Sequence, residues 1–139
     1  MNNKVTVYVN REETHGESWT VQATDESGYE TGSVQIRRMT ENKALAFIFG
    51  FVSEPEQSPE ETSEILSALV GKIIANSPRN NIAVLQATAI AGSPNAEVLE
   101  SLGFHSRTRF VNPNTGHTLR LYGMTLAPVA PVSVTSDSL

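Results

Sequence analysis

The sequence predicts a single α/β domain built on a mixed central β-sheet, with one long helix, one short helix and a shortened amino-terminal part. Two observations lead to this prediction. A capped amphipathic helix lies between two strongly apolar strand segments, residues 44–52 and 82–90, which implies a parallel crossover. Short alternating segments on either side add further strands, giving the order β-β-β-β-α-β-α-β-β. The 139 residues suit one domain, which we place at residues 1–126.

The first half of the chain has the pattern of four strands. Valine alternates with polar residues at 5–9, which is typical of a half-buried strand, and the charged segment 11–18 is expected to form a loop. Alternation resumes at residues 19–23 and 33–39. In residues 44–52 apolar side chains occupy both faces. We therefore expect this strand in the middle of a sheet covered on both sides, with its phenylalanines in the core.

The long helix has the clearest sequence signals. Ser58, Pro59, Glu60 and Glu61 form the pattern of a capping box with proline at the first helical position. The apolar residues that follow at three-and-four spacing predict a stripe packed on the sheet: Ile65, Leu66, Leu69, Val70, Ile73 and Ile74.

The second half of the chain predicts a short helix and a closing hairpin. Ser93 and Pro94 start the helix, and Gly103 is placed to end it. Two last strands, at about 106–111 and 117–125, are joined by residues with hairpin-turn chemistry.

Composition excludes several classes of function. The net charge is −5 and no Lys/Arg run is present, so we expect neither a nucleic-acid nor a membrane partner. The pairs Arg37–Arg38 and Arg107/Arg109 are interpreted as solvent edges of strands. The chain has no cysteine, which rules out disulfides and thiolate catalysis. The first residues lack the apolar core of a signal peptide, and the apolar run 44–52 is far too short to cross a bilayer, so a cytoplasmic protein is expected.

The titratable residues do not form a catalytic pattern. His15, His105 and His117 fall on separate predicted loops or strand ends without metal-ligand spacing, so neither a metal site nor a triad is expected. Glu60 and Glu61 are adjacent carboxylates in a first helical turn, where caps are far commoner than acid/base pairs.

One segment resembles a known family. Residues 95–104, Asn-Ala-Glu-Val-Leu-Glu-Ser-Leu-Gly-Phe, resemble the short helix of the GNAT superfamily of N-acetyltransferases, which ends in Leu-Gly-Phe before a closing β-hairpin. The order of elements agrees with that family over residues 43–126. The resemblance implies a GNAT-like fold and, for a working member, acetyl-CoA as cofactor.

The resemblance also implies that the cofactor loop is degenerate. The family's Gln/Arg-x-x-Gly-x-Gly/Ala loop holds the acetyl-CoA pyrophosphate on backbone N–H groups at a helix start. Here the corresponding segment is Gln-Ser-Pro-Glu-Glu-Thr at 57–62, so two glycine positions are lost, a proline removes a donor, and the capping box and nearby glutamates oppose an anion. We interpret Gln57, Ser58, Glu60 and Thr62 as a vestigial loop that binds no cofactor.

Two further departures concern catalysis. Family members commonly place a tyrosine four residues before the glycine of the short helix, as the acid that protonates the CoA thiolate. Leu99 stands there and has no proton to donate. The family also inserts two helices between its first two strands to wall the acceptor site, for which residues 11–18 are too few.

These observations favour a non-catalytic GNAT-like structural or protein-binding module. A bacteriophage virion or accessory protein is the setting suggested by analogy of fold alone. The alternative is a divergent acetyl-CoA-dependent N-acetyltransferase that binds its cofactor along the strand edge of Phe51, Val52 and Ser53.

Residues 127–139 are expected to form an extended tail. Proline recurs among small apolar and serine residues, a composition that cannot build a core. We predict that this tail binds a protein partner, in a groove or along a sheet edge. The competing expectation is that it folds back over its own domain.

Overall fold

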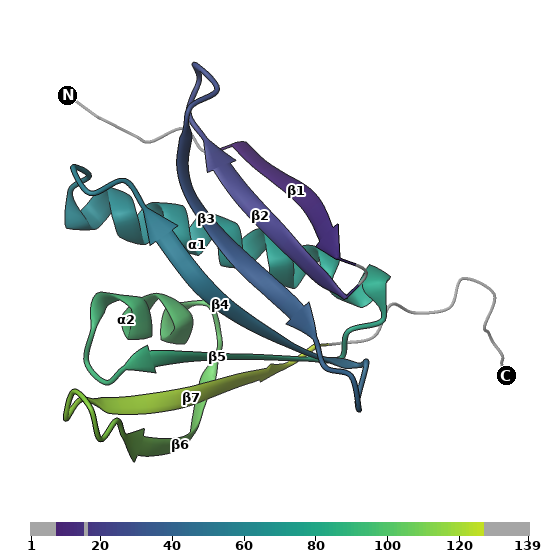
Figure 1. The fold of residues 1–139 in the computed structure, drawn as a ribbon, viewed down its shortest axis with the longest axis vertical. Coiled ribbons are helices and arrows are strands. Elements are labelled where there is room, and N and C mark those ends of the chain that lie inside the picture. Colours follow the sequence, from purple (N-terminus) through teal and green to yellow (C-terminus); the bar gives the residue numbers. More distant parts are fainter. Residues whose placement is uncertain (1–7, 16, 127–139) are drawn as a thin grey trace, which may run out of the picture.

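Seven strands form one sheet in the order β1-β2-β3-β4-β5-β7-β6 (Figure 1). The computed structural model describes residues 8–15 and 17–126, and for residues 8–15 only the backbone. Strands β4 and β5 are parallel, and the other neighbouring pairs are antiparallel. The strands are β1 Tyr8–His15, β2 Ser18–Thr24, β3 Glu30–Arg38, β4 Leu45–Ser53, β5 Val84–Ile90, β6 His105–Val111 and β7 Thr118–Thr125. The mixed sheet and its parallel crossover confirm the predicted fold class.

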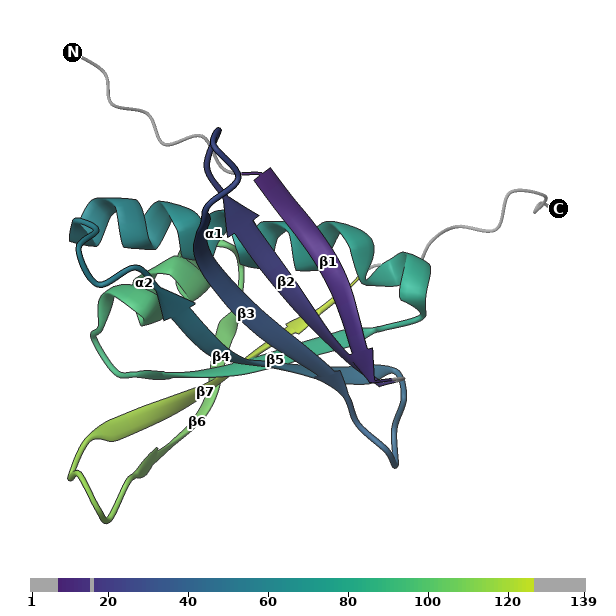
Figure 2. The same cartoon turned by 45° about the horizontal axis from the view of Figure 1, so that its top comes forward.

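Two α-helices pack on one side of this sheet (Figures 1 and 2). Helix α1, Pro59–Asn76, connects β4 to β5 together with a short 3₁₀ helix η1, Pro78–Asn80, and helix α2, Pro94–Ser101, connects β5 to β6. We call the side with the helices the covered face and the other side the open face. In the described residues no helix lies against the open face.

The hydrophobic core lies between the covered face and the helices. From α1 it takes the predicted stripe, in which Ile65, Leu66, Leu69, Val70 and Ile73 are buried. From the strands it takes every second residue: Trp19, Val21, Ala23, Val34, Ile36, Ala46, Ile48, Leu85, Ala87 and Ala89. The apolar stripe of the helix, with its period of 3.6 residues, therefore packs against the apolar face of the strands, with its period of 2, in one core layer.

The first hairpin corrects the sequence analysis. A loop is predicted at residues 11–18, but the backbone of residues 11–15 continues β1 and pairs with β2 as far as His15 opposite Ser18. The ladder joins main-chain groups, so it tolerates a charged segment without an apolar pattern. No described helix separates β1 from β2, as expected. The predicted strand residues 5–7 and the tail 127–139 lie outside the described residues.

The coverage of β4 is also corrected. It occupies the middle of the sheet as predicted, but only one of its faces is covered. Ala46 and Ile48 are buried in the core on the covered face, whereas Phe47 is half-buried and Phe49 is 38% exposed on the open face. The prediction that all the phenylalanines are core residues is therefore wrong for Phe49.

A β-bulge then changes the alternation in β4. Ser33 pairs with Val52 and Gln35 with Phe49, so Gly50 and Phe51 together oppose one residue of β3. Gly50 has φ +69°, a conformation that favours glycine. As a result Phe51 packs against the core, and Val52 is 61% exposed.

Candidate functional site

The amino end of α1 follows directly on the end of β4, and the structure confirms its capping box. The Ser58 hydroxyl accepts a hydrogen bond from the Glu61 N–H at 3.1 Å, and the Glu61 carboxylate accepts one from the Ser58 N–H at 3.1 Å. The side chains of Ser58 and Glu61 therefore already accept from two of the amide donors that a bound anion would need.

The neighbouring amides also donate hydrogen bonds within the protein. The Gln57 N–H donates to the Glu54 carbonyl at 3.2 Å, and the Thr62 N–H donates to the Ser58 carbonyl at 3.0 Å. Pro59 has no N–H. Between residues 57 and 62, the Glu60 N–H is thus the one amide without an acceptor among the described residues. A single N–H is a poor cradle for a pyrophosphate.

Gln57, which fits the family pattern, is directed elsewhere. Its Nε2 donates to the Thr31 carbonyl of β3 at 3.1 Å, which ties the loop to the sheet. Its Oε1 is buried without a hydrogen-bond partner among the described residues. The Gln57 Oε1 is an acceptor and needs a hydrogen-bond donor. The oxygens of a pyrophosphate are also acceptors, so this atom could not bind one.

Negative charge surrounds this helix end. Four exposed carboxylates, none of them paired with a described Lys or Arg, belong to Glu54, Glu56, Glu60 and Glu64. Two of these four glutamates line a shallow groove of about 440 Å³ between α1 and α2, whose lining residues are Pro59, Glu60, Ser63, Glu64, Ser67 and Val98. The carboxylates satisfy the positive end of the helix dipole and repel a second anion.

The strand edge Phe51–Ser53 has a different character. Pairing between β4 and β5 runs only from Leu45 opposite Val84 to Ile48 opposite Ala87. Beyond that point β4 continues to Ser53, while β5 stays paired with β7 (Figure 1). The two parallel strands therefore separate, and the edge of β4 facing β5 is not paired by a described strand over its last residues.

The position of the expected acid lies inside the core. Leu99 is 4% exposed on α2 and packs with Ala96 and Val98 toward the sheet. Gly103 ends the helix with φ +104°, as the sequence predicts. No proton donor stands at this position.

A buried tyrosine lies close by, on β7. Tyr122 is fully buried, and its hydroxyl donates to the Glu100 carboxylate at 2.6 Å. Arg120 approaches the same carboxylate at 3.7 Å. Burial, followed by the hydrogen bond to Glu100, raises the pKa of Tyr122. The phenol is thus held neutral, and it anchors α2 to β7.

Comparison with known proteins bears on the fold. No family model matches the chain, and no curated protein matches its sequence. Solved structures do match. The ribosomal-protein-S18-alanine N-acetyltransferase from Escherichia coli superposes with a TM-score of 0.65 at 16% identity, over 88% of this chain and 77% of that one. The fold is GNAT-like.

Two other solved structures give the same result. A protein assigned to the GNAT acetyltransferase family, from Desulfovibrio desulfuricans, has a TM-score of 0.65 at 14% identity, over 80% of this chain and 70% of that one. The spermidine/spermine N-acetyltransferase from Vibrio cholerae has a TM-score of 0.64 at 13% identity, over 79% and 66%. Identities this low establish the GNAT-like fold alone.

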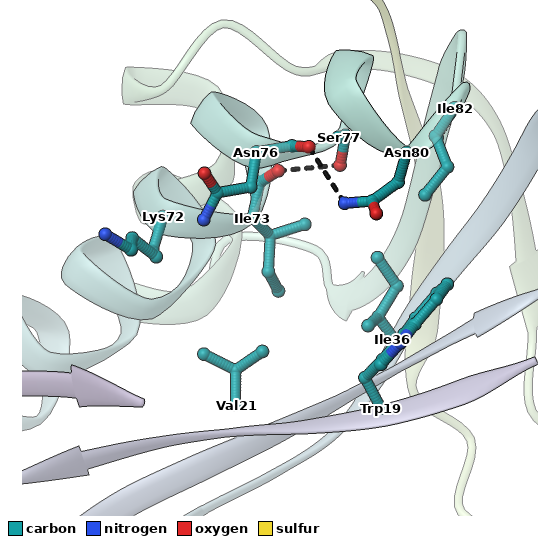
Figure 3. Close-up of a pocket in the computed structure, with 9 residues that line it drawn as sticks. All are labelled: Trp19, Val21, Ile36, Lys72, Ile73, Asn76, Ser77, Asn80 and Ile82. Atoms are coloured by element: carbon teal, nitrogen blue, oxygen red, sulfur yellow. Dashed lines mark hydrogen bonds between the residues drawn. The ribbon is translucent and has the colours of Figure 1, made fainter. Parts of the chain in front are cut away.

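A second hollow lies at the opposite end of α1 (Figure 3). It is lined by Trp19, Val21, Ile36, Lys72, Ile73, Asn76, Ser77, Asn80 and Ile82. Its volume of about 50 Å³ is room for a few water molecules, since each needs roughly 10–15 Å³. The Ser77 hydroxyl donates to the Ile73 carbonyl, and the Asn80 amide to the Asn76 carbonyl. This hollow cannot hold a cofactor.

Sequence reasoning missed the role of Arg38. Instead of forming a solvent edge, its side chain is only 15% exposed and lies over the Trp19 ring, 5.1 Å from the centroid. It pairs with Glu17 at 3.0 Å and donates to the Asn80 carbonyl at 2.7 Å. Arg38 therefore links β2, β3 and η1, a structural role that no local pattern signals.

The remaining expectations concern metals and membranes. Among the described residues no group of three His, Cys, Asp or Glu side chains lies close enough together to hold a metal ion. His105 lies at the start of β6, and His117 lies in the turn before β7. No described helix is both long and apolar enough to cross a membrane.

Proposed function

We propose that this chain is a non-catalytic GNAT-like module that binds protein partners and does not transfer acetyl groups. The closed amino end of α1 is the observation that carries the proposal. There, among the described residues, the capping box, the Gln57–Glu54 turn and Pro59 leave one amide without an acceptor, and the segment carries four exposed glutamates. The position of Leu99 in the core supports the same reading, because no acid stands where the family places one.

The alternative is a divergent acetyl-CoA-dependent N-acetyltransferase. The separation of β4 from β5 favours it, because the edge at Phe51, Val52 and Ser53 offers main-chain groups to an extended ligand. Such a cofactor would have to be held by this edge with little help from the helix.

Titration with acetyl-CoA separates the two functions. A ligand at a hundred times its dissociation constant raises the free energy of unfolding by about 2.7 kcal/mol, which corresponds to several degrees in Tm. We expect no change in Tm at millimolar acetyl-CoA and no heat in calorimetry. A saturable shift in the unmodified chain would contradict the proposal.

A matched variant tests whether the loop is what prevents acetyl-CoA from binding. Glu60→Gly together with Thr62→Gly restores both glycines of the family pattern and removes one carboxylate. If the loop alone prevents binding, this variant gains a measurable response to acetyl-CoA that the unmodified chain lacks. Its melting temperature without ligand serves as the reference, because each glycine costs the helix about 1 kcal/mol.

We further propose that residues 127–139 contribute to partner binding, as their composition suggests, in a bacteriophage virion or accessory setting. Deleting the residues after Leu126 tests the first part. An interaction arm predicts an unchanged Tm and weaker association in sizing experiments. A lower Tm with unchanged association would instead mean that the segment folds back on its own domain.

A further inference from the structure

The sheet ends at β6 in an exposed edge. β6 is the last strand in the order, and β7 is the one described element that packs closely on it (Figure 1). Every residue of β6 is exposed. Phe110 on the open face is 47% exposed, and Val111 on the opposite face is 60% exposed. An edge of this kind offers main-chain groups to a further strand, which is a recurring way for protein segments to bind.

The register of the hairpin shows which main-chain groups lie on this edge. The Asn112 N–H donates to the His117 carbonyl at 2.9 Å, so these two residues form a hydrogen-bonded pair. In an antiparallel ladder such pairs alternate with pairs that are not hydrogen-bonded. Val111 and Arg109, one and three residues before Asn112, therefore belong to pairs of the second kind. Their N–H and C=O groups point away from β7 and form what we call the β6 edge.

Positive charge flanks the β6 edge on both faces of the sheet. Arg107 lies over Gly123 on the open face, and Arg109 is opposite Arg120 on the covered face. Neither Arg107 nor Arg109 pairs with a described carboxylate, and the carboxylate that Arg120 approaches, on Glu100, is 3.7 Å away. Like charges directly opposite one another are destabilising, so a strand that brings a carboxylate is favoured beside β6.

The composition of residues 132–139 fits this edge. The segment reads Val-Ser-Val-Thr-Ser-Asp-Ser-Leu, with no proline and no positive charge, and its length is close to that of β6. Val132 and Val134 alternate with serine and threonine, which is typical of a half-buried strand. In an extended segment these two valines share one face and Asp137 is on the other. The segment can therefore bring apolar contact to one face and a carboxylate to the opposite face.

The place where the described chain ends favours a second copy over the same one. The Leu126 N–H donates to the Ala83 carbonyl at 2.8 Å, so the chain leaves β7 on the side of β5 and not of β6. To reach its own β6 edge, the tail would have to cross the connection that enters β6 at residues 102–104. Residues 127–131 span about 15 Å when extended, which suits an arm that leaves its own domain.

We propose that residues 132–139 of one copy of this chain add as a strand to the β6 edge of a second copy. A two-fold axis makes the exchange mutual and closes the assembly as a dimer. The valines of the added strand lie beside Phe110 on the open face, and Asp137 lies near Arg109 on the covered face. This inference rests on the proposed role of residues 127–139 in partner binding, and it names a second copy of the chain as the partner.

Proline substitution tests the β6 edge in the full chain. The molar mass is measured by light scattering and sedimentation over a range of concentrations, and we expect the unmodified protein to dimerise. Val111→Pro removes an outward N–H and leaves the ladder to β7 intact. The dissociation constant of the dimer should rise about tenfold or more, with an unchanged circular dichroism spectrum, because a carbonyl of the added strand loses its donor. The matched control Val111→Thr keeps the N–H and should keep the dimer.

A second proline variant tests the tail. Neighbouring residues of a strand direct their N–H groups to opposite sides, so Val134→Pro with Thr135→Pro removes an N–H that faces β6 in any register. We expect the same weakening as for Val111→Pro. The control is Val134→Thr with Thr135→Ser, which keeps both N–H groups and should dimerise.

Exchange of charge tests the predicted pair. Arg109→Glu and Asp137→Arg should each weaken the dimer about fivefold, because each places like charges together. The double variant should return the dissociation constant to within about twofold of the unmodified value, since the pair again joins opposite charges. Two single variants whose effects simply add in the double variant would contradict this contact.

The possible failures are distinguishable. A chain that stays monomeric at every concentration overturns the inference. A dimer that is lost with the tail prolines but tolerates Val111→Pro also overturns it, although residues 127–139 would still bind a partner. Tail prolines that lower Tm without changing association mean that the tail folds back on its own domain, so the role of the tail as an arm fails as well. The titration with acetyl-CoA tests the non-catalytic function independently of all three results.

Discussion

The two faces of β4 are built from neighbouring residues and end in opposite environments. Ala46 is fully buried and Ile48 is 5% exposed on the covered face, whereas Phe49 on the open face is 38% exposed. The larger side chain thus has the more exposed position. Hydrophobicity of the strand alone does not decide burial; the placement of α1 and α2 on one side does.

The same contrast bears on function. On the covered face α1 and α2 bury their apolar stripes against the sheet, and Tyr122 secures α2 to β7. On the open face no described helix replaces the wall that the resemblance implies for an acetyl acceptor. Five substitutions and one control measure how different the two faces are, and a failure of any one would weaken the comparison.

The largest effect is expected for Leu69→Ala. Leu69 is fully buried at the centre of the α1 stripe, so its truncation leaves a cavity and should lower the free energy of unfolding by about 2–5 kcal/mol. Chemical denaturation with an unchanged m-value is the measurement. A loss below about 1 kcal/mol would mean that α1 does not pack as described, because only exposed positions cost so little.

Glycine on the two faces provides a matched pair. At Gly32 on the covered face an added Cβ would lie 2.8 Å from the Ile65 side chain and 3.2 Å from the Val52 carbonyl. Gly32→Ala should therefore cost about 1–3 kcal/mol through overpacking.

At Gly123 on the open face, an added Cβ would meet only the side chain of Arg107, 2.9 Å from its Nε. That exposed side chain can move aside, so Gly123→Ala should change stability by less than about 0.5 kcal/mol. Equal losses for the two alanines in thermal melts would contradict the difference between the faces.

Tyr122→Phe should cost on the order of 1 kcal/mol, because it removes the hydroxyl bound to Glu100 and keeps the ring in the core. The raised pKa of Tyr122 sets the pH dependence. A neutral phenol is favoured in the folded state, so the contribution is complete below about pH 10 and is lost as pH rises through the raised pKa. Unfolding of both proteins between pH 7 and 11 measures it. A difference that grows above pH 10 would be the wrong sign.

A small effect is also expected for Phe49→Ala. Although Phe49 belongs to the central strand, its partial exposure on the open face limits the loss to about 1 kcal/mol. Ile48→Ala at the neighbouring buried position is the control and should cost about 2–5 kcal/mol. A larger loss at Phe49 than at Ile48 would show that something covers the open face in solution.

The sequence predicted the elements well where a local pattern carries the information. The capping box at Ser58, the α1 stripe, the end of α2 at Gly103 and the parallel crossover were all legible, because each depends on a few neighbouring residues. The amino-terminal hairpin was not, because charged residues 11–15 enter β1 through main-chain pairing that their side chains do not signal.

At the candidate site, too, some features were predictable from the sequence and others were not. The resemblance predicts which residues of the loop and of α2 depart from the family pattern. The structure adds the contacts of two of the residues concerned: Gln57 donates to the Thr31 carbonyl, and Leu99 packs in the core. No spacing predicts that Tyr122 meets Glu100, 22 residues earlier in the chain, or that Arg38 reaches Asn80, 42 residues later.

By itself, the sequence determined the order of strands and helices along the chain, the absence of cysteine chemistry and the capping box at the amino end of α1. These follow from hydrophobic period, composition and capping, which act over a few residues. Only the tertiary structure decided that both helices lie on one face and that β4 separates from β5 after Ile48, just before the Gly50 bulge. Those features arise from contacts between segments far apart in the chain, which no local pattern records.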